Sequence, residues 1–96
     1  MSFNQKRRLK NSNPFTAQHG TGTIVRSLAG RNRKCVFVVT GCFTDKKGKL
    51  FAYLCDGVKY TAANPKLKSA LHLETVRIAA GSVKTDEEVL KLLQNQ

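Results

Sequence analysis

The 96-residue chain contains no tryptophan, one methionine and two prolines, and only six of its residues are acidic. It also has no apolar run of about 18 residues, which a transmembrane helix would need. No apolar segment follows its first cations, so we expect no secretory signal. A mitochondrial presequence is a weaker alternative, because the basic stretch 6–10 lacks an apolar face at helical spacing. The length predicts one small domain.

Groups suited to catalysis are also scarce. The chain has two histidines, and neither motif nor spacing suggests a Ser/Cys–His–Asp arrangement. Carboxylates cluster only at 86–88, where helix capping explains them, and no P-loop or dinucleotide-binding fingerprint occurs. We therefore expect a protein that is not an enzyme and that uses no cofactor, no metal and no small-molecule substrate.

Cysteine is too rare for a disulfide framework. Cys35, Cys42 and Cys55 lie in expected strands among apolar neighbours, and none of them belongs to a C-x-x-C pair. This pattern predicts buried free thiols in a reducing cytosol. A zinc site that adds His19 or His72 to these cysteines is the alternative, although the close ligand pairs of structural zinc sites are missing.

The chain is rich in positive charge, with 17 Lys and Arg residues and a net charge of +11. Residues 1–34 carry eight cations and no acid, whereas residues 35–96 carry nine cations and six acids. This skew predicts binding to a polyanion, and nucleic acid is the commonest polyanion for a small cytosolic domain. An acidic membrane surface would use the same charge, but we expect no membrane partner because no basic amphipathic helix is present.

Residues 1–20 have the composition of a basic, flexible extension. Polar and basic residues dominate, Pro14 interrupts the segment, and Phe3, Leu9 and Phe15 are isolated apolar residues. One interpretation is that the extension becomes ordered on a polyanion. The alternative is a tail that only improves solubility.

Residues 21–96 carry the patterns of a small, mostly antiparallel β-barrel with one short helix behind it. Thr23–Leu28 is the first expected strand, although Arg26 interrupts its apolar pattern. Cys35–Phe43 is apolar on both faces, as a central barrel strand would be. A polar turn then joins it to a strand at Leu50–Cys55, so that the two form a hairpin.

The second half of the pattern is less regular. Residues 59–68 show no clear periodicity. Leu71–Val76 alternates with period two, which predicts a half-buried strand with its odd-numbered residues on the inner face. Thr85 and Glu88 form a capping box ahead of a short apolar stripe, which predicts a helix from Asp86 to about Gln94.

The most informative stretch is the expected strand–loop–strand of Gly22–Val39. Its loop places Arg31, Arg33 and Lys34 directly after Gly30. Because strands hold both ends of this loop, the entropic cost of ordering its cations on a phosphate would be small. The arginine guanidinium matches a phosphate with two hydrogen bonds and also stacks on unpaired bases.

Further cations support the same interpretation. Arg26 would lie near the mouth of the barrel, or the aliphatic part of its side chain would be buried while its guanidinium extends to solvent. Lys66 and Lys68 alternate and would form a second row of phosphate contacts, while His72 faces outward. The three lysines of the 44–49 turn are interpreted as a solvated hairpin tip, with RNA contact as the alternative. The candidate RNA-binding residues are Lys6, Arg7, Arg8, Lys10, Arg26, Arg31, Asn32, Arg33, Lys34, Lys66, Lys68 and His72.

Exposed aromatic residues for base stacking are expected to be few. Tyr53, Tyr60 and Phe15 are the candidates, and Phe37 is assigned to the core. With so few stacking groups, we expect recognition of the RNA backbone and shape more than of base sequence.

These residues resemble a known family. The stretch 22–39 is similar to a KOW motif, and Asp56–Lys59, Leu71–Glu74 and Thr85–Val89 follow it in the order that the family has. The pieces together span residues 20–93. The chain therefore resembles KOW-domain RNA-binding proteins, in particular the small KOW-type ribosomal proteins of the archaeal and eukaryotic large subunit and their bacterial relatives.

The resemblance implies an SH3-like barrel whose first loop, here Gly30–Lys34, binds ribosomal RNA of the large subunit. It also implies a cytoplasmic, ribosome-associated protein with ribosomal proteins as possible neighbours. Two positions depart from the family pattern. Asn32 and Arg33 stand where a glycine is often found, and Arg26 stands where the family is apolar or aromatic.

Two other functions remain as alternatives at this point. An SH3-like barrel can bind an extended peptide, but such grooves are lined by aromatic residues, which this chain has in small number. A transcription-linked module that binds nucleic acid is the other.

Overall fold

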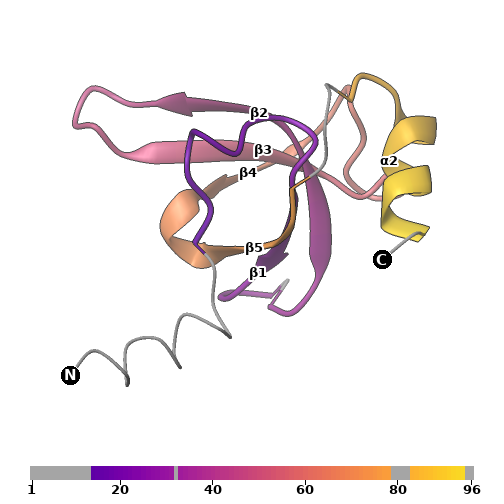
Figure 1. Cartoon of the computed structure of the whole chain (residues 1–96), viewed down its shortest axis with the longest axis horizontal. Helices are drawn as coiled ribbons and strands as arrows, with labels where there is room; N and C mark the ends of the chain where they lie inside the picture. The colour runs from indigo at the N-terminus through magenta and orange to yellow at the C-terminus, as the bar shows by residue number, and fades with distance from the viewer. Residues whose placement is uncertain (1–13, 32, 79–82, 95–96) are drawn as a thin grey trace.

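The computed structural model describes residues 14–31, 33–78 and 83–94. Over these residues, five strands form one antiparallel sheet in the order β4-β3-β2-β1-β5, and a short α-helix follows them (Figure 1). The elements are β1 (Ile24–Ser27), β2 (Val36–Thr44), β3 (Leu50–Cys55), β4 (Lys66–Ser69), the 3₁₀ helix η1 (Ala70–His72), β5 (Leu73–Arg77) and α2 (Asp86–Gln94). The expectation of a mostly β, antiparallel fold with a C-terminal helix is confirmed.

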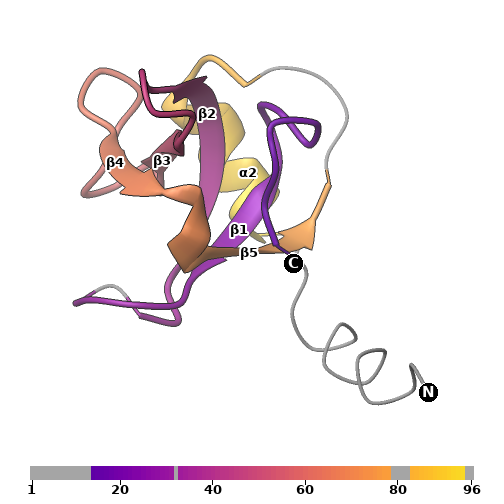
Figure 2. The same ribbon diagram turned by 90° about the vertical axis from the view of Figure 1, so that its left-hand side faces the viewer.

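The sheet does not close into a barrel. β4 and β5 stand at the two ends of the strand order, and among the described residues the chain links them through η1 rather than through strand pairing. Figure 2 shows the chain passing from β4 through η1 into β5. The prediction of a mostly antiparallel β fold is therefore confirmed, but the strand pairing does not show the closed barrel that the sequence predicts.

The central strand β2 is rich in Val and Phe, and in its first half the consecutive residues Phe37, Val38 and Val39 are all buried, so that both faces are covered there. Its residue Val38 pairs with Ile24 of β1 on one side and with Cys55 of β3 on the other. The register with β3 shifts between Val39 and Gly41, which is the mark of a β-bulge.

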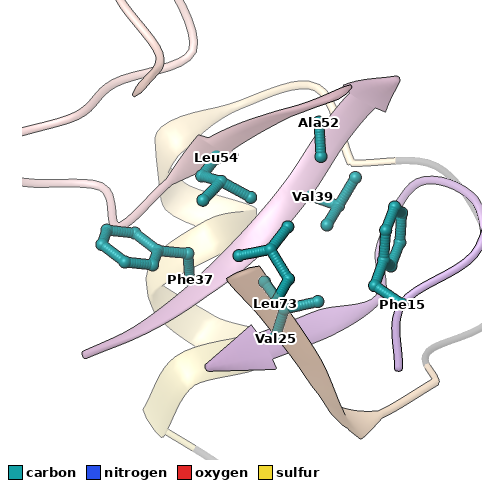
Figure 3. Packing of buried hydrophobic residues seen from close by; sticks show 7 residues of the cluster. All are labelled: Phe15, Val25, Phe37, Val39, Ala52, Leu54 and Leu73. Atoms are coloured by element: carbon teal, nitrogen blue, oxygen red, sulfur yellow. The ribbon is translucent and has the colours of Figure 1, made fainter. Parts of the chain in front are cut away.

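Each face of the sheet carries its own apolar cluster, because side chains alternate along a strand. The inner cluster draws side chains from β1, β2, β3, β5 and the segment before β1 (Figure 3). Its buried members are Phe15, Val25, Phe37, Val39, Ala52, Leu54 and Leu73. The outer cluster lies under α2 and consists of Ile24, Val38, Cys55, Val83 and Val89.

Phe15 is buried, with an exposed fraction of only 3%. Its backbone N–H lies 3.5 Å from the carbonyl oxygen of Leu73, and the preceding Pro14 forms an isolated antiparallel bridge with Glu74. The prediction that Phe15 is an exposed stacking residue is therefore wrong. Its ring packs on the inner face of the curved sheet. The residues around Phe15 in the sequence are polar, and a local pattern does not reveal that strands distant in the sequence leave space there for an apolar ring.

The region around Leu71 also differs from its prediction. The strand that the sequence predicts at Leu71–Val76 corresponds to β5, which begins only at Leu73. Leu71 lies in η1, with 77% of its surface exposed. The side chain of Ser69 accepts a hydrogen bond from the Leu71 N–H at 3.3 Å, which starts the 3₁₀ turn. β4, which the irregular stretch 59–68 did not predict, pairs with β3.

The three cysteines are free thiols with different surroundings. Cys55 is buried, and this burial raises the pKa of its thiol. Cys42 is half-buried, but Cys35 is exposed because β2 begins one residue later. The prediction of burial is thus wrong for Cys35. Among the described residues, no group of three or more His, Cys, Asp or Glu side chains is placed to hold a metal ion.

The helix α2 has the predicted bounds and the predicted capping box. The Glu88 N–H donates to Thr85 Oγ1 at 3.2 Å, and the Thr85 N–H donates to Glu88 Oε1 at 3.1 Å. Hydrogen bonds from the backbone of Lys84 and Thr85 hold the pKa of the Glu88 carboxyl below its usual value. Within the described part of the chain, no helix has the length and apolar character needed to cross a membrane.

Replacing the buried ring by Phe15→Ala should lower the free energy of unfolding by about 3 kcal/mol or more, because it leaves a cavity in the inner cluster. Urea titration measures this decrease. Thr16→Ala, at the exposed neighbouring position, is the control and should change the free energy by less than about 0.5 kcal/mol. Equal small effects of the two substitutions would contradict a core role for Phe15.

Two glycines allow a matched test of how the turn after β3 packs on α2. Gly48 and Gly57 both have positive φ, at 85° and 82°, so alanine is strained at either position. A β-carbon at Gly57 would also lie 2.7 Å from Leu90 Cγ, whereas at Gly48 it would meet nothing within 4 Å. Gly57→Ala should therefore lower the melting temperature more than Gly48→Ala. The same decrease in both variants would contradict this packing.

Candidate nucleic-acid interface

The loop between β1 and β2 presents a cluster of cations, as the sequence predicts. Arg31, Arg33 and Lys34 are all exposed. Gly30 and Lys34 have positive φ angles of 80° and 72°, so the chain turns sharply at both positions. Lys34 is the only described non-glycine residue with such a backbone, which indicates that hydrogen bonds around it impose the conformation.

Backbone hydrogen bonds hold this loop on both sides. The Lys34 N–H donates to the Ser27 carbonyl at 2.7 Å, and the Ser27 N–H donates to the Cys35 carbonyl at 2.9 Å. The Leu28 N–H donates to the carbonyl of His72 at 2.8 Å, which ties the loop to η1. The cations are thus mounted on a backbone that is already ordered, which lowers the entropic cost of binding.

Lys68 connects this loop to the far end of the sheet. Its Nζ donates a hydrogen bond to the Ala29 carbonyl at 2.9 Å, although Lys68 belongs to β4. At Gly30, a β-carbon would lie 3.4 Å from the same Nζ. Lys68 therefore both braces the loop and brings a fourth cation to it.

Arg26, Arg33 and Lys34 line one shallow hollow together with the carboxylate of Glu74. Arg26 Nη1 lies 2.7 Å from Glu74 Oε1, and Glu74 is buried while the Arg26 side chain is 42% exposed. Three cations against one carboxylate leave the hollow positive. The pairing explains how an arginine is accommodated inside an apolar strand, and Glu74 is the partner that the sequence did not reveal.

Comparison with known proteins adds no family assignment. The chain matches no protein-family model and no curated protein sequence. The likeness to KOW domains therefore depends on the residues of 22–39 and the three shorter segments that follow them. The interface itself is inferred from the geometry of the loop.

The remaining predicted cations do not form a single row with the loop. Lys66 Nζ lies 5.2 Å from the ring centroid of Tyr60, on which Lys59 also lies at 5.5 Å. Tyr60 in turn packs edge-on against Phe37, at 6.0 Å between centroids. Of the expected second row, only Lys68 joins the loop.

His72 is exposed, as the sequence predicts, and lies in η1 beside the start of the loop. Tyr53 is exposed too, whereas Tyr60 is half-buried and carries two ammonium groups. Five of the predicted contact residues lie outside the described residues, namely Lys6, Arg7, Arg8, Lys10 and Asn32.

Removing the brace with Lys68→Met should loosen the loop without unfolding the sheet, because the methionine keeps most of the apolar stem. We expect the amide protons of Arg33 and Lys34 to exchange several-fold faster in NMR hydrogen-exchange measurements. Lys66→Met is the matched control on the same strand, since its ammonium contacts Tyr60 rather than the loop. Unchanged exchange in Lys68→Met would show that Lys68 does not brace the loop.

Proposed function

We propose that this protein is a non-enzymatic RNA-binding protein that binds ribosomal RNA of the large subunit, as a ribosomal or ribosome-associated protein of the cytoplasm. The observation that carries the proposal is the braced cationic loop. Arg31, Arg33 and Lys34 are exposed there, while backbone bonds and Lys68 hold the chain that bears them. A loop held in this way favours phosphate contacts of defined geometry over non-directional electrostatic attraction.

The topology supports the finer assignment to an SH3-like, KOW-type barrel. The strand order β4-β3-β2-β1-β5, a central strand shared between β1 and β3, and a 3₁₀ turn between the last two strands all suit that fold. In this assignment the β1–β2 loop occupies the place of the family's RNA-binding loop. The positive φ of Lys34 offers a reason why the glycine often found in that loop is dispensable here.

The electrostatics favour nucleic acid over a neutral peptide. Within the described part of the chain, Arg31, Arg33 and Lys34 take part in no ion pair, and the hollow beside them is positive. A neutral peptide would leave these charges uncompensated. An RNA phosphate backbone would neutralise them and release counterions, so binding should depend steeply on salt.

The triple substitution Arg31→Gln, Arg33→Gln and Lys34→Gln tests the loop. The slope of log binding constant against log salt should fall by about one unit for each phosphate that the loop no longer neutralises, measured with a structured fragment of large-subunit RNA. The control carries Lys59→Gln, Lys84→Gln and Lys91→Gln, which remove the same charge from other exposed positions. Equal slopes in the two triple variants would contradict the assignment of the loop.

A second experiment tests the ribosomal partner itself. The wild-type protein should sediment with the large subunit at low salt and leave it as salt rises, and the loop variant should leave at lower salt than the control variant. Retention of a protein partner after nuclease treatment, with no binding to ribosomal RNA, would instead favour a protein-interaction module.

A further inference from the structure

The outer face of the sheet is only partly covered. Near β1 and the start of β2, this face packs under α2 in the outer cluster that contains Val38 and Cys55. Because side chains alternate along β3, Tyr53 and Phe51 point to the same side as Cys55. They lie toward the tip of the β2–β3 hairpin, which extends away from α2 (Figure 1).

Three aromatic side chains form a contiguous group on this uncovered part, and we name Phe43, Phe51 and Tyr53 the hairpin ladder. The rings of Phe43 and Phe51 are stacked, with 5.5 Å between centroids and 20° between planes. Tyr53 follows at 5.6 Å from Phe43. Phe43 and Tyr53 are each 38% exposed, and Leu67, the β4 partner of Tyr53, is 49% exposed.

Lysines lie in the hairpin turn at one end of the hairpin ladder. Lys49 Nζ lies 5.6 Å from the centroid of Phe51, and Lys46 and Lys47 are placed in the same turn. The one acid of the turn, Asp45, accepts hydrogen bonds from the N–H groups of Lys47 and Lys49. Three lysines and one aspartate leave the tip with a net positive charge next to open rings.

This combination identifies the kind of partner. A second copy of the chain would bring another net charge of +11 against the tip, and a neutral apolar partner would leave the lysines uncompensated. A single-stranded nucleic acid matches both properties, since its bases stack on aromatic rings while its phosphates pair with nearby cations.

The hairpin tip and the cationic loop also border a common hollow. Leu28, at the start of the loop, and Lys49, at the tip, both line an apolar depression together with Leu50 and Leu71. Leu28 lines the positive hollow as well. Phe15 and Leu73 of the inner cluster also line this depression, so it lies on the inner side of the sheet. An RNA that leaves the loop along it would reach the hairpin ladder, on the outer face, by passing around the hairpin tip.

We propose that the hairpin ladder stacks unpaired bases of the RNA that the cationic loop holds by its phosphates. This inference rests on the proposed function and adds a second kind of contact to it, a stacking site for single-stranded nucleotides. It also adds base stacking to the expectation, drawn from the few aromatic residues of the chain, that the RNA backbone and shape are recognised more than the base sequence.

The test compares the double variant Phe43→Leu with Tyr53→Leu against the ring-keeping control Phe43→Tyr with Tyr53→Phe. The probes are a short oligoadenylate and an abasic oligonucleotide of equal length. We expect the leucine variant to bind oligoadenylate about tenfold or more weakly than wild type, because its side chains cannot stack on a base. The control should bind as wild type does, the abasic probe should bind all three proteins equally, and the salt slope should stay unchanged because no charge is removed.

A measurement on the wild-type protein keeps the test valid even if the leucine variant folds poorly. The ring-proton resonances of Phe43 and Tyr53 should shift upfield when oligoadenylate is added, and they should not shift with the abasic probe. Equal oligoadenylate affinity of the leucine variant and wild type, with unshifted ring protons, would overturn the stacking site. The proposed function would still hold after the loss of the stacking site if wild type binds RNA with a salt slope that depends on the loop. If wild type binds no RNA, the proposed function itself fails.

Discussion

The pairing of β2 on both of its edges is the constraint on which the rest of this structure depends. Val38 illustrates it, because its backbone lies between β1 and β3 while its side chain packs under α2. The neighbours Phe37 and Val39 point to the opposite face and enter the inner cluster. Burying apolar side chains on both faces of one strand is the largest favourable contribution that so small a domain has available. Without β2 neither cluster would form.

Both proposed RNA contacts lie at the ends of this strand. The cationic loop enters β2 at Val36, and the hairpin that carries the ladder leaves it after Thr44. The central strand therefore sets the separation between the cationic loop and the aromatic rings. Lys68 strengthens the arrangement, since it joins the loop to β4, two strands away from β2 in the sheet.

Several parts of the fold could be predicted because their signals are local. The capping box joins Thr85 to Glu88 within one helical turn, and the turn of 44–49 joins β2 to β3 directly. Other parts involve partners that are distant in sequence. Arg26 and Glu74 are 48 residues apart, and Lys68 is 39 residues from Ala29. The residue type alone gives the charge at these positions but not the group that the charge contacts. The sequence therefore predicts Lys68 only as a phosphate contact, and it does not single out Glu74.

The sequence by itself determined the mostly β character, the terminal helix, the strong positive charge and the cations after Gly30. These properties follow from periodicity, capping and composition, which act over a few neighbouring residues. Only the tertiary structure decided that Phe15 is core, that Leu71 is exposed and that the partly exposed rings of Phe43 and Tyr53 lie together on the sheet surface. Burial is decided by which surfaces the folded chain brings together, and α2 is long enough to cover only one part of the outer face.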